Sequence, residues 1–415
     1  MESAGSAFKQ SIHLLLTRRF GTFWFASLLS NIGTWAQQVA QPWLLLSLGA
    51  SPFLLGLDAF ALGGPVLVLM LVGGVLADRA DRRRVIAWCQ SIQLLCPILL
   101  VVLLLNGAVQ PWMVIVLSLV VGITDALSMP SFQTIVSSLV DKSQLPRGIA
   151  LNATQFNLSR ILGPSLAGVL MASVGAVGAF AVSAASYVPF IAVALWILPS
   201  AAAVAQRPAD AASTGLFVGA RGVLREPALR SAVLTVLVGS LLCSPLITFC
   251  PVLVKQVFNA DISHFGLTMS AFGAGGLLGA LGLLTIDPRR DRRPMGAWLA
   301  MGYALVVVLS AVNLWAWGLP VLFVLGGVCM TAGNASANAF LQAATPAAMR
   351  GQAISLFMLA MRGGMAVGSL LTGVTVGWFG VQRALLLNGL LALVALWVLR
   401  RAWLRAVVVP AAAAR

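Results

Sequence analysis

The chain has 415 residues, of which 60% are hydrophobic and only 9% are charged, and its mean hydropathy is +0.97. Soluble domains carry about 25% charged residues, so this composition excludes a soluble enzyme or binding domain and indicates an integral membrane protein. The formal net charge is +15. The basic residues stand in short segments between apolar runs, however, and this pattern does not favour nucleic acid as a partner.

Long apolar runs follow one another along the whole chain. A membrane-spanning helix needs about 20 apolar residues. The first run, 20–48, is too long and too polar to be a cleavable signal sequence. Short connections such as 49–52 and 106–111 predict tight hairpins at the membrane surface. The sequence predicts twelve spans, at 20–48, 53–77, 85–106, 111–139, 149–173, 177–198, 229–254, 263–286, 295–317, 320–343, 352–378 and 381–404.

The longest connection lies in the middle of the chain and separates two sets of six spans. We assign residues 1–199 to an N-terminal six-helix bundle, 200–228 to a cytoplasmic linker and 229–415 to a C-terminal six-helix bundle. With both termini in the cytoplasm, 22 of the 26 Lys and Arg residues fall on the cytoplasmic side, as the positive-inside rule requires. The expected fold class is therefore an all-α membrane protein with twelve transmembrane helices.

The two halves resemble each other at matching places. The segment Asp81-Arg82-Arg83, between spans 2 and 3, corresponds to Asp291-Arg292-Arg293 between spans 8 and 9. Arg147-Gly148 before span 5 corresponds in the same way to Arg350-Gly351 before span 11. Two parallel six-helix pseudo-repeats are typical of transporters whose halves rock about a site near the bilayer midplane.

The connection after span 2 carries the most specific motif. Its glycines allow close helix contact, and its Asp-Arg pair and basic cluster can latch one conformation through ion pairs. A loop that only sets the topology is the alternative. The segment reads Gly73-Gly74-Val75-Leu76-Ala77-Asp78-Arg79-Ala80-Asp81-Arg82-Arg83-Arg84. It resembles the signature loop of the major facilitator superfamily, which implies the major facilitator fold and a conformational latch made by Gly74, Asp78, Arg79, Arg82 and Arg83.

Further motifs in spans 1, 4 and 5 narrow this resemblance. They are Ser30-Asn31-Ile32-Gly33-Thr34-Trp35, Met129-Pro130 and Asn157-Leu158-Ser159-Arg160-Ile161-Leu162-Gly163-Pro164. These segments look like the enterobactin-exporter-like, or transmembrane secretion effector, branch of the superfamily. The resemblance implies an exporter of siderophores or amphipathic drugs in the bacterial inner membrane, driven by protons. Ser128 and Phe132 nevertheless stand where branch members often carry Asp and Arg.

Span 5 also contains Gly163, Pro164 and Gly168, which resemble the antiporter motif of the superfamily. Proline removes a backbone donor and kinks a helix, and the glycines would permit close contact with the other half. A simple kink in a packed helix is the alternative reading.

Four charged residues lie inside the spans, where a charge is costly unless it faces a cavity or a partner. At the helical rise of about 1.5 Å per residue, Asp125 and Arg160 fall at similar depths, which predicts an ion pair between them. Arg362 has no acid at its depth in its own half. It either reaches Asp58 across the halves or binds an anionic group of the substrate. Asp125, Asp58 and Arg160 are the candidates for proton coupling.

Polar residues at helical spacing follow one face of span 1 and one face of span 10. Lipid cannot satisfy such groups, so each stripe faces a cavity or another helix. In the fold that the resemblance implies, these two spans line the central cavity, which favours the first alternative. The stripes are Asn31, Thr34, Gln38 and Gln41 in span 1, and Thr331, Asn334, Asn338 and Gln342 in span 10. We predict a substrate site made by Asn31, Gln38, Gln41, Asn334, Asn338 and Arg362.

The sequence thus predicts a secondary active exporter of a small organic molecule, working by alternating access with proton antiport. An uptake carrier for a sugar or organic acid and a non-transporting sensor or scaffold are the alternatives. No nucleotide-binding loop, catalytic triad or metal-ligand spacing occurs, so we expect no enzyme activity, cofactor or metal site. The expected partners are the substrate, protons and membrane lipid, and the protein is expected to be a monomer. His13 and His264 lie near connections and are expected to be solvated.

Overall fold

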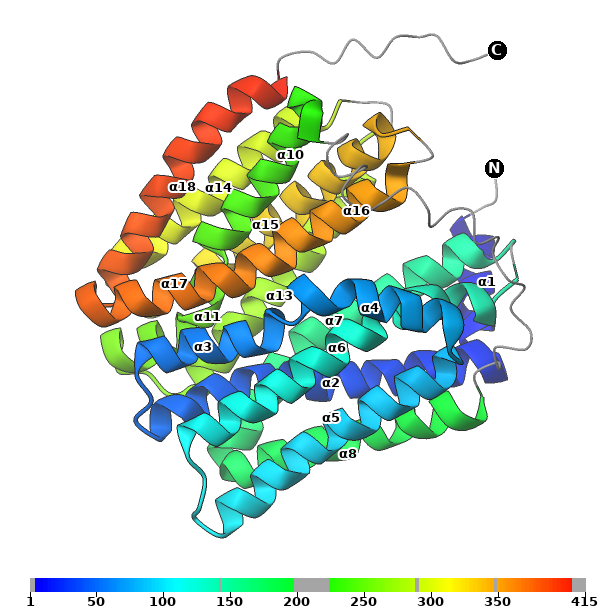
Figure 1. The fold of residues 1–415 in the computed structure, drawn as a ribbon, viewed down its shortest axis with the longest axis horizontal. Coiled ribbons are helices and arrows are strands. Elements are labelled where there is room, and N and C mark those ends of the chain that lie inside the picture. Colours follow the sequence, from blue (N-terminus) through cyan, green and yellow to red (C-terminus); the bar gives the residue numbers. More distant parts are fainter. Residues whose placement is uncertain (1–3, 142, 198–223, 288–290, 347–348, 405–415) are drawn as a thin grey trace.

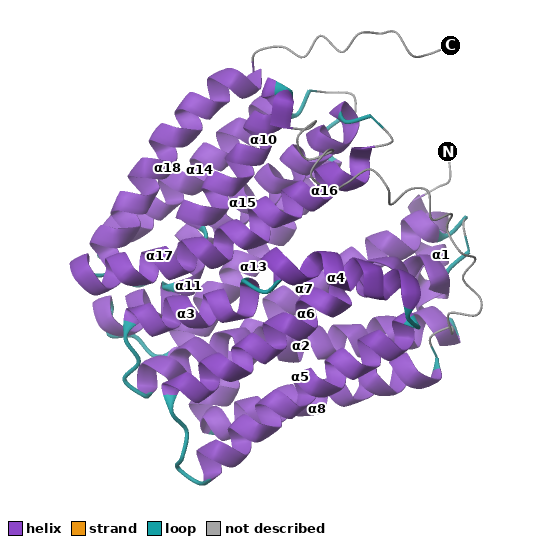
Figure 2. Cartoon of the chain, in the orientation of Figure 1, coloured by secondary structure: helices purple, strands orange, loops and turns teal. Residues whose placement is uncertain are grey.

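The computed structural model describes residues 4–141, 143–197, 224–287, 291–346 and 349–404, and every regular element in these ranges is a helix (Figures 1 and 2). Ten helical segments are long and apolar enough to cross a membrane. The helices α2 and α7 are of comparable length but more polar, and they complete the series of spans. The prediction of an all-α membrane protein is confirmed. Of the predicted linker, 200–228, residues 200–223 lie outside the described residues.

The N-terminal bundle begins with a short helix that precedes the first span. The third and fourth helices form the second predicted span, and a break at Gly64 and Pro65 separates them. The bounds are α1 (Ala4–Leu15), α2 (Arg18–Ser47), α3 (Pro52–Gly63), α4 (Val66–Arg79), α5 (Arg82–Leu105), α6 (Pro111–Leu139), α7 (Leu145–Ser173) and α8 (Gly175–Trp196).

The C-terminal bundle contains two spans that are interrupted by π-helical segments. The seventh span consists of α10 (Pro227–Val238), η3 (Gly239–Cys243), α11 (Pro245–Thr248), α12 (Cys250–Val252) and η4 (Leu253–Val257). The eleventh consists of α16 (Arg350–Met358), η6 (Leu359–Gly363) and α17 (Gly364–Phe379). The remaining helices are α13 (Ile262–Leu284), α14 (Arg293–Val312), α15 (Gly318–Ala344) and α18 (Val381–Leu404). Single-turn π segments are rare and often occur at functional sites.

Tight connections join the spans at the end of the molecule that is opposite the termini. Gly49 and Gly107 have φ angles of 75° and 62°, in the left-handed region that favours glycine. Both residues therefore close the hairpins that the short connections predict. His264 differs from its prediction, because it is buried at the start of α13 and its Nε2 lies 3.0 Å from the Ala316 carbonyl.

The two bundles meet near that same end and diverge toward the end that carries the termini (Figure 1). Apolar packing follows this division. A single large cluster joins both bundles, with Leu44 and Leu45 from α2 beside Phe249 and Phe265 from the C-terminal half. Toward the termini the packing separates into two clusters, one within each bundle. The main helix contacts between the bundles are α3 with α17 and α7 with α13.

The turns at Asp81 and Asp291 have the same hydrogen-bond pattern, as expected if the two halves are repeats. The Asp81 carboxylate accepts a hydrogen bond from the Arg83 backbone N–H at 3.1 Å, and Asp291 accepts one from Arg293 N–H at 3.0 Å. Each aspartate thereby satisfies a backbone donor at the start of the next helix. Arg293 also donates its Nε to the Asp291 carboxylate at 3.0 Å, and this hydrogen bond holds the pKa of Asp291 below its ordinary value.

Candidate substrate and coupling site

Asp125 and Arg362 form an ion pair that connects the two bundles. Arg362 Nη1 donates to Asp125 Oδ2 at 2.9 Å. This pairing corrects the predicted ion pair of Asp125 with Arg160 and the alternative in which Arg362 reaches Asp58. Substrate binding by Arg362 stays a prediction. Both partners of the observed pair lie near the middle of their spans, in α6 and in η6.

The backbone around Arg362 places its side chain at this contact. The residue belongs to the π-helical segment η6, where the extra residue per turn rotates the side chain relative to a regular helix. Gly363 follows it, and a Cβ there would overlap Leu67 of α4, so the glycine allows the two bundles to approach. The side chains of Arg362 and Asp125 are 36% and 43% exposed. Part of the surface of each partner is therefore not covered by other residues of the chain.

Arg160 lies between two aromatic rings that come from opposite bundles. Its guanidinium carbon is 5.8 Å from the ring centroid of Trp35 in α2 and 5.0 Å from that of Phe272 in α13. Both distances suit cation–π attraction. Within the described ranges, Arg160 donates no hydrogen bond and has no acidic partner. Unlike Arg362, it keeps its donors free.

Asp58 is the most buried of the intramembrane charged residues, with 6% of its surface exposed. Its two carboxylate oxygens accept hydrogen bonds from the Gln41 amide at 3.0 Å each, and Oδ1 also accepts from the Ser118 hydroxyl at 2.5 Å. These contacts join α2, α3 and α6 within the N-terminal bundle. Asp58 therefore does not reach Arg362, and its partners in this cluster are neutral.

The polar stripe of span 1 is largely satisfied inside its own bundle. Asn31 donates to Gln155 of α7 at 3.3 Å, Thr34 lies 3.1 Å from the Tyr187 hydroxyl of α8, and Gln41 is engaged by Asp58. Gln38 is exposed and makes no hydrogen bond with any side chain that the structure describes. The part of this stripe that is free to face a cavity is thus narrower than the sequence predicts. The substrate contacts of Asn31, Gln38 and Gln41 stay a prediction.

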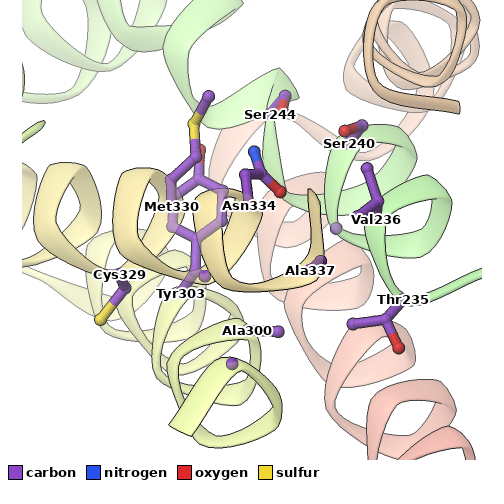
Figure 3. Close-up of a pocket in the computed structure, with 13 residues that line it drawn as sticks. Thr235, Val236, Ser240, Ser244, Ala300, Tyr303, Cys329, Met330, Asn334 and Ala337 are labelled. Atoms are coloured by element: carbon purple, nitrogen blue, oxygen red, sulfur yellow. The ribbon is translucent and has the colours of Figure 1, made fainter. Parts of the chain in front are cut away.

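The polar stripe of span 10 borders a small pocket inside the C-terminal bundle (Figure 3). Asn334 of α15 lies in its wall, together with Tyr303 of α14 and with Ser240 and Ser244 near η3. The cavity measures about 20 Å³, which is enough for roughly one water molecule and too small for an organic substrate. Asn338 accepts a hydrogen bond from Gln342 at 3.1 Å. Substrate binding by Asn334 and Asn338 also stays a prediction.

One hydroxyl group near Arg160, the Thr331 Oγ1 of α15, has no hydrogen-bond partner among the described residues. The Tyr303 hydroxyl is engaged instead by the Ser244 side chain, which borders the same small pocket. A Cβ on Gly276 would lie 3.1 Å from Arg160 Nη1 and 2.9 Å from Thr331 Oγ1. Gly276 therefore packs closely against both groups and lets Arg160 and Thr331 lie side by side. Buried hydroxyl groups without partners are uncommon in proteins, which makes this cluster a candidate ligand site.

The antiporter-like motif packs as expected at one of its two glycines. A Cβ on Gly266 of α13 would lie 2.7 Å from the Pro164 carbonyl and 3.0 Å from the Gly168 Cα. Pro164 and Gly168 thus form the close contact with the other half. Gly163 faces its own bundle instead, because a Cβ there would lie 2.5 Å from the Trp35 Cβ. The expectation of contact across the halves is therefore wrong for Gly163.

The predicted latch is only partly described. Gly74, Asp78 and Arg79 belong to α4, but their side chains lie outside the described part of the structure. Arg82 begins α5. The Arg83 Nε lies 3.3 Å from the Asp81 carboxylate, and the Arg83 Nη1 lies 3.5 Å from the Leu195 carbonyl. These contacts of Arg83 stay within the N-terminal bundle, so the latch function remains a prediction.

Trp35, Phe272 and Gly276 lie at this site, yet the sequence did not identify them as site residues, and Trp35 was noted only within the span 1 motif. Aromatic and glycine residues are common throughout the spans, so composition gave no reason to select these three. A periodic signal existed only for Thr331, which belongs to the stripe of span 10. The interruption of span 11 by η6 also lacks a clear signal in the sequence.

Comparison with known proteins is consistent with this geometry. A family described as transmembrane secretion effector matches residues 11–414. The staphyloferrin A transporter of Staphylococcus aureus is 25% identical over 386 residues, which cover 89% of this chain and 92% of the relative. The enterobactin exporter EntS of Shigella flexneri is 27% identical over 373 residues, covering 85% and 84%. The multidrug efflux pump Tap of Mycolicibacterium fortuitum is 28% identical over 295 residues, covering 68% and 71%.

Solved structures share the fold at low sequence identity. The nucleoside transporter NupG superposes with a TM-score of 0.73 at 15% identity, over 94% of this chain and 100% of that structure. A bacterial homologue of the human lysosomal transporter Spinster gives a TM-score of 0.71 at 14% identity, over 95% and 98%. Together with the family match over nearly the whole length, these findings show that the chain belongs to the transmembrane secretion effector family of the major facilitator superfamily.

Proposed function

We propose that the protein is a secondary active exporter that moves a small organic molecule out of the cytoplasm by alternating access in exchange for protons. The relatives that export enterobactin and drugs support the direction of transport. The observation that carries the coupling part of the proposal is the ion pair of Asp125 with Arg362 between the bundles. We infer a transporter without enzymatic activity, embedded in the bacterial cytoplasmic membrane with both termini in the cytoplasm.

In this orientation the structure corresponds to a state that is open toward the cytoplasm. The bundles share one apolar cluster at the end opposite the termini and pack separately at the other end. An ionised Asp125 can hold Arg362, whereas a protonated carboxyl group has lost the charge that attracts the guanidinium. In the proposed cycle, this ion pair would form once Asp125 has released its proton to the cytoplasm. In the opposite, outward-open state, a proton taken up from the outside would neutralise Asp125. A neutral Asp125 attracts Arg362 less, so the pair would form less readily.

Inside-out vesicles that contain the protein test this function. Their lumen corresponds to the cell exterior, so an exporter driven by protons accumulates substrate when the lumen is acidic. Iron-free enterobactin and ethidium are suitable probes, because relatives are named as exporters of enterobactin and of drugs. We expect accumulation of at least one probe that disappears when a protonophore collapses the gradient. Accumulation of both probes only in the reverse direction would favour the uptake carrier, and absence of transport of either would favour the sensor.

A further inference from the structure

Arg160 is a charged group near the middle of the molecule whose charge and donors are not matched by any residue that the structure describes. Of the other intramembrane charges in the described residues, Asp125 pairs with Arg362, and Asp58 accepts hydrogen bonds from Gln41 and Ser118. The guanidinium of Arg160 lies instead over the faces of Trp35 and Phe272. Ring faces attract a cation, but they do not accept the in-plane N–H groups of a guanidinium. A ligand that supplies acceptor oxygens would complete this site.

The groups around Arg160 can hold such a ligand from the opposite bundle. The unpartnered Thr331 Oγ1 belongs to α15. Gly276 of α13 packs closely against both Arg160 Nη1 and Thr331 Oγ1, which places these two groups side by side across the two halves. A bound oxyanion could therefore accept from the guanidinium of one half and from the Thr331 hydroxyl of the other half.

We propose that Arg160 and Thr331 bind the carboxylate of an amphipathic organic anion, with its flat apolar part beside Trp35 and Phe272. This inference rests on the proposed export function and names the chemical class of the substrate. A guanidinium presents parallel N–H donors that match the two oxygens of a carboxylate. Two aromatic rings beside the charge favour a ligand whose body is planar and apolar. In this proposal, Arg160 makes the charged contact with the substrate that the sequence predicts for Arg362.

A binding measurement on the full-length protein in lipid nanodiscs tests this site. The probes are dansylglycine, an aromatic carboxylate, and dansylglycinamide, which has the same aromatic part without the charge. Empty nanodiscs correct for partition into lipid. We expect the unsubstituted protein to bind the carboxylate more tightly than the amide. Arg160→Gln should weaken binding of the carboxylate by about tenfold or more, since it removes a charge-assisted hydrogen bond, and should leave binding of the amide within about twofold.

Two further variants guard against a folding defect. Arg160→Lys keeps the charge but not the fork, so its affinity for the carboxylate should lie between those of the unsubstituted protein and Arg160→Gln. Thr331→Val replaces only the hydroxyl group by a methyl group of similar size and should weaken binding of the carboxylate selectively. Arg383→Gln, at an exposed position at the start of α18, is the matched control and should bind both probes normally.

Equal binding of the two probes by the unsubstituted protein, or unchanged binding of dansylglycine by Arg160→Gln, would overturn the proposal. The result is independent of the transport assay. Gradient-driven export without binding that depends on Arg160 would refute this site and leave the export function standing. Selective carboxylate binding without any export would support the site and refute the export function.

Discussion

Asp125 and Arg362 are 237 positions apart in the chain, and their side chains meet at 2.9 Å in a contact between the two bundles. The pair lies where relative movement of the bundles must lengthen or shorten it. Because both side chains are more than a third exposed, water screens their attraction, and such pairs contribute about 1 kcal/mol or less to stability. The pair is thus better suited to respond to protonation than to hold the fold together.

Exchange of the two charges tests the pairing. Asp125→Arg and Arg362→Asp should each reduce gradient-driven export by about tenfold or more, within the usual range of coupling between sites. Each single variant places like charges at the contact. The double variant restores opposite charges and should recover part of the activity. Export by the double variant that is no better than by either single variant would mean that the two residues act independently.

The same pair should contribute little to thermal stability. A double-mutant cycle with Asp125→Asn and Arg362→Gln isolates the interaction from other effects of each substitution. We expect a coupling free energy below about 1 kcal/mol, measured by thermal unfolding in detergent, because both partners are solvent-exposed. A coupling several times larger would identify a structural tie between the bundles.

Close packing of α7 on α13 should favour the conformation seen here. A Cβ on Gly266 would lie 2.7 Å from the Pro164 carbonyl, so Gly266→Val should separate the bundles at the end opposite the termini. Spin labels at Ser47 and Lys255 report this change, since Ser47 Oγ and Lys255 Nζ are 3.2 Å apart in this state. We expect a longer label distance in Gly266→Val.

Gly282→Val is the matched control for this experiment. Gly282 belongs to the same helix, and a Cβ there would have no atom within 4 Å. The control should give the label distances of the parent protein. An unchanged distribution in Gly266→Val would show that this contact does not determine the conformation.

Asp58 should act as a structural residue of the N-terminal bundle. In Asp58→Asn, a flip of the Gln41 amide would let its oxygen accept from the new Asn, so the cluster can stay satisfied. Asp58→Ala leaves the Gln41 amide without this acceptor, which should lower the free energy of unfolding by about 1–3 kcal/mol. Thermal unfolding separates the two variants. Loss of proton dependence in a stable Asp58→Asn protein would instead make Asp58 a coupling residue.

The sequence alone was sufficient to predict the architecture of the fold. Long apolar runs and short polar connections are local features, and they predict the helices and the hairpins at Gly49 and Gly107. The paired motifs at Asp81 and Asp291 likewise predict the repeat, because each aspartate bonds to a residue only two positions away. Local signals of this kind do not depend on how the bundles pack.

The pairing of charges depended on packing and was predicted incorrectly. Depths calculated with a regular rise of about 1.5 Å per residue do not include the break between α3 and α4 or the π segment η6 that carries Arg362. Depth also says nothing of the direction in which a side chain points around its helix. Arg160 points toward Trp35 and Phe272, and Asp125 reaches Arg362 in the other bundle.

The prediction that the polar stripes line a cavity also lacked information on how the helices pack. Periodicity identifies the face of a helix but not the element that covers it. In span 1 the covering elements bring their own polar groups, such as Gln155 and Tyr187, which satisfy Asn31 and Thr34. Those partners are more than 120 positions away along the chain, so the sequence contains no local sign of them.

Gradient-driven transport by Asp125→Asn is the most direct test of the account. In inside-out vesicles with an acidic lumen, the parent protein should accumulate its probe until a protonophore is added. Asp125→Asn cannot alternate between a charged and a neutral state, so its accumulation should be the same with and without the gradient. Asp141→Asn, at an exposed position after α6, should behave like the parent. Full accumulation by Asp125→Asn that still collapses with the protonophore would contradict proton coupling at the pair with Arg362.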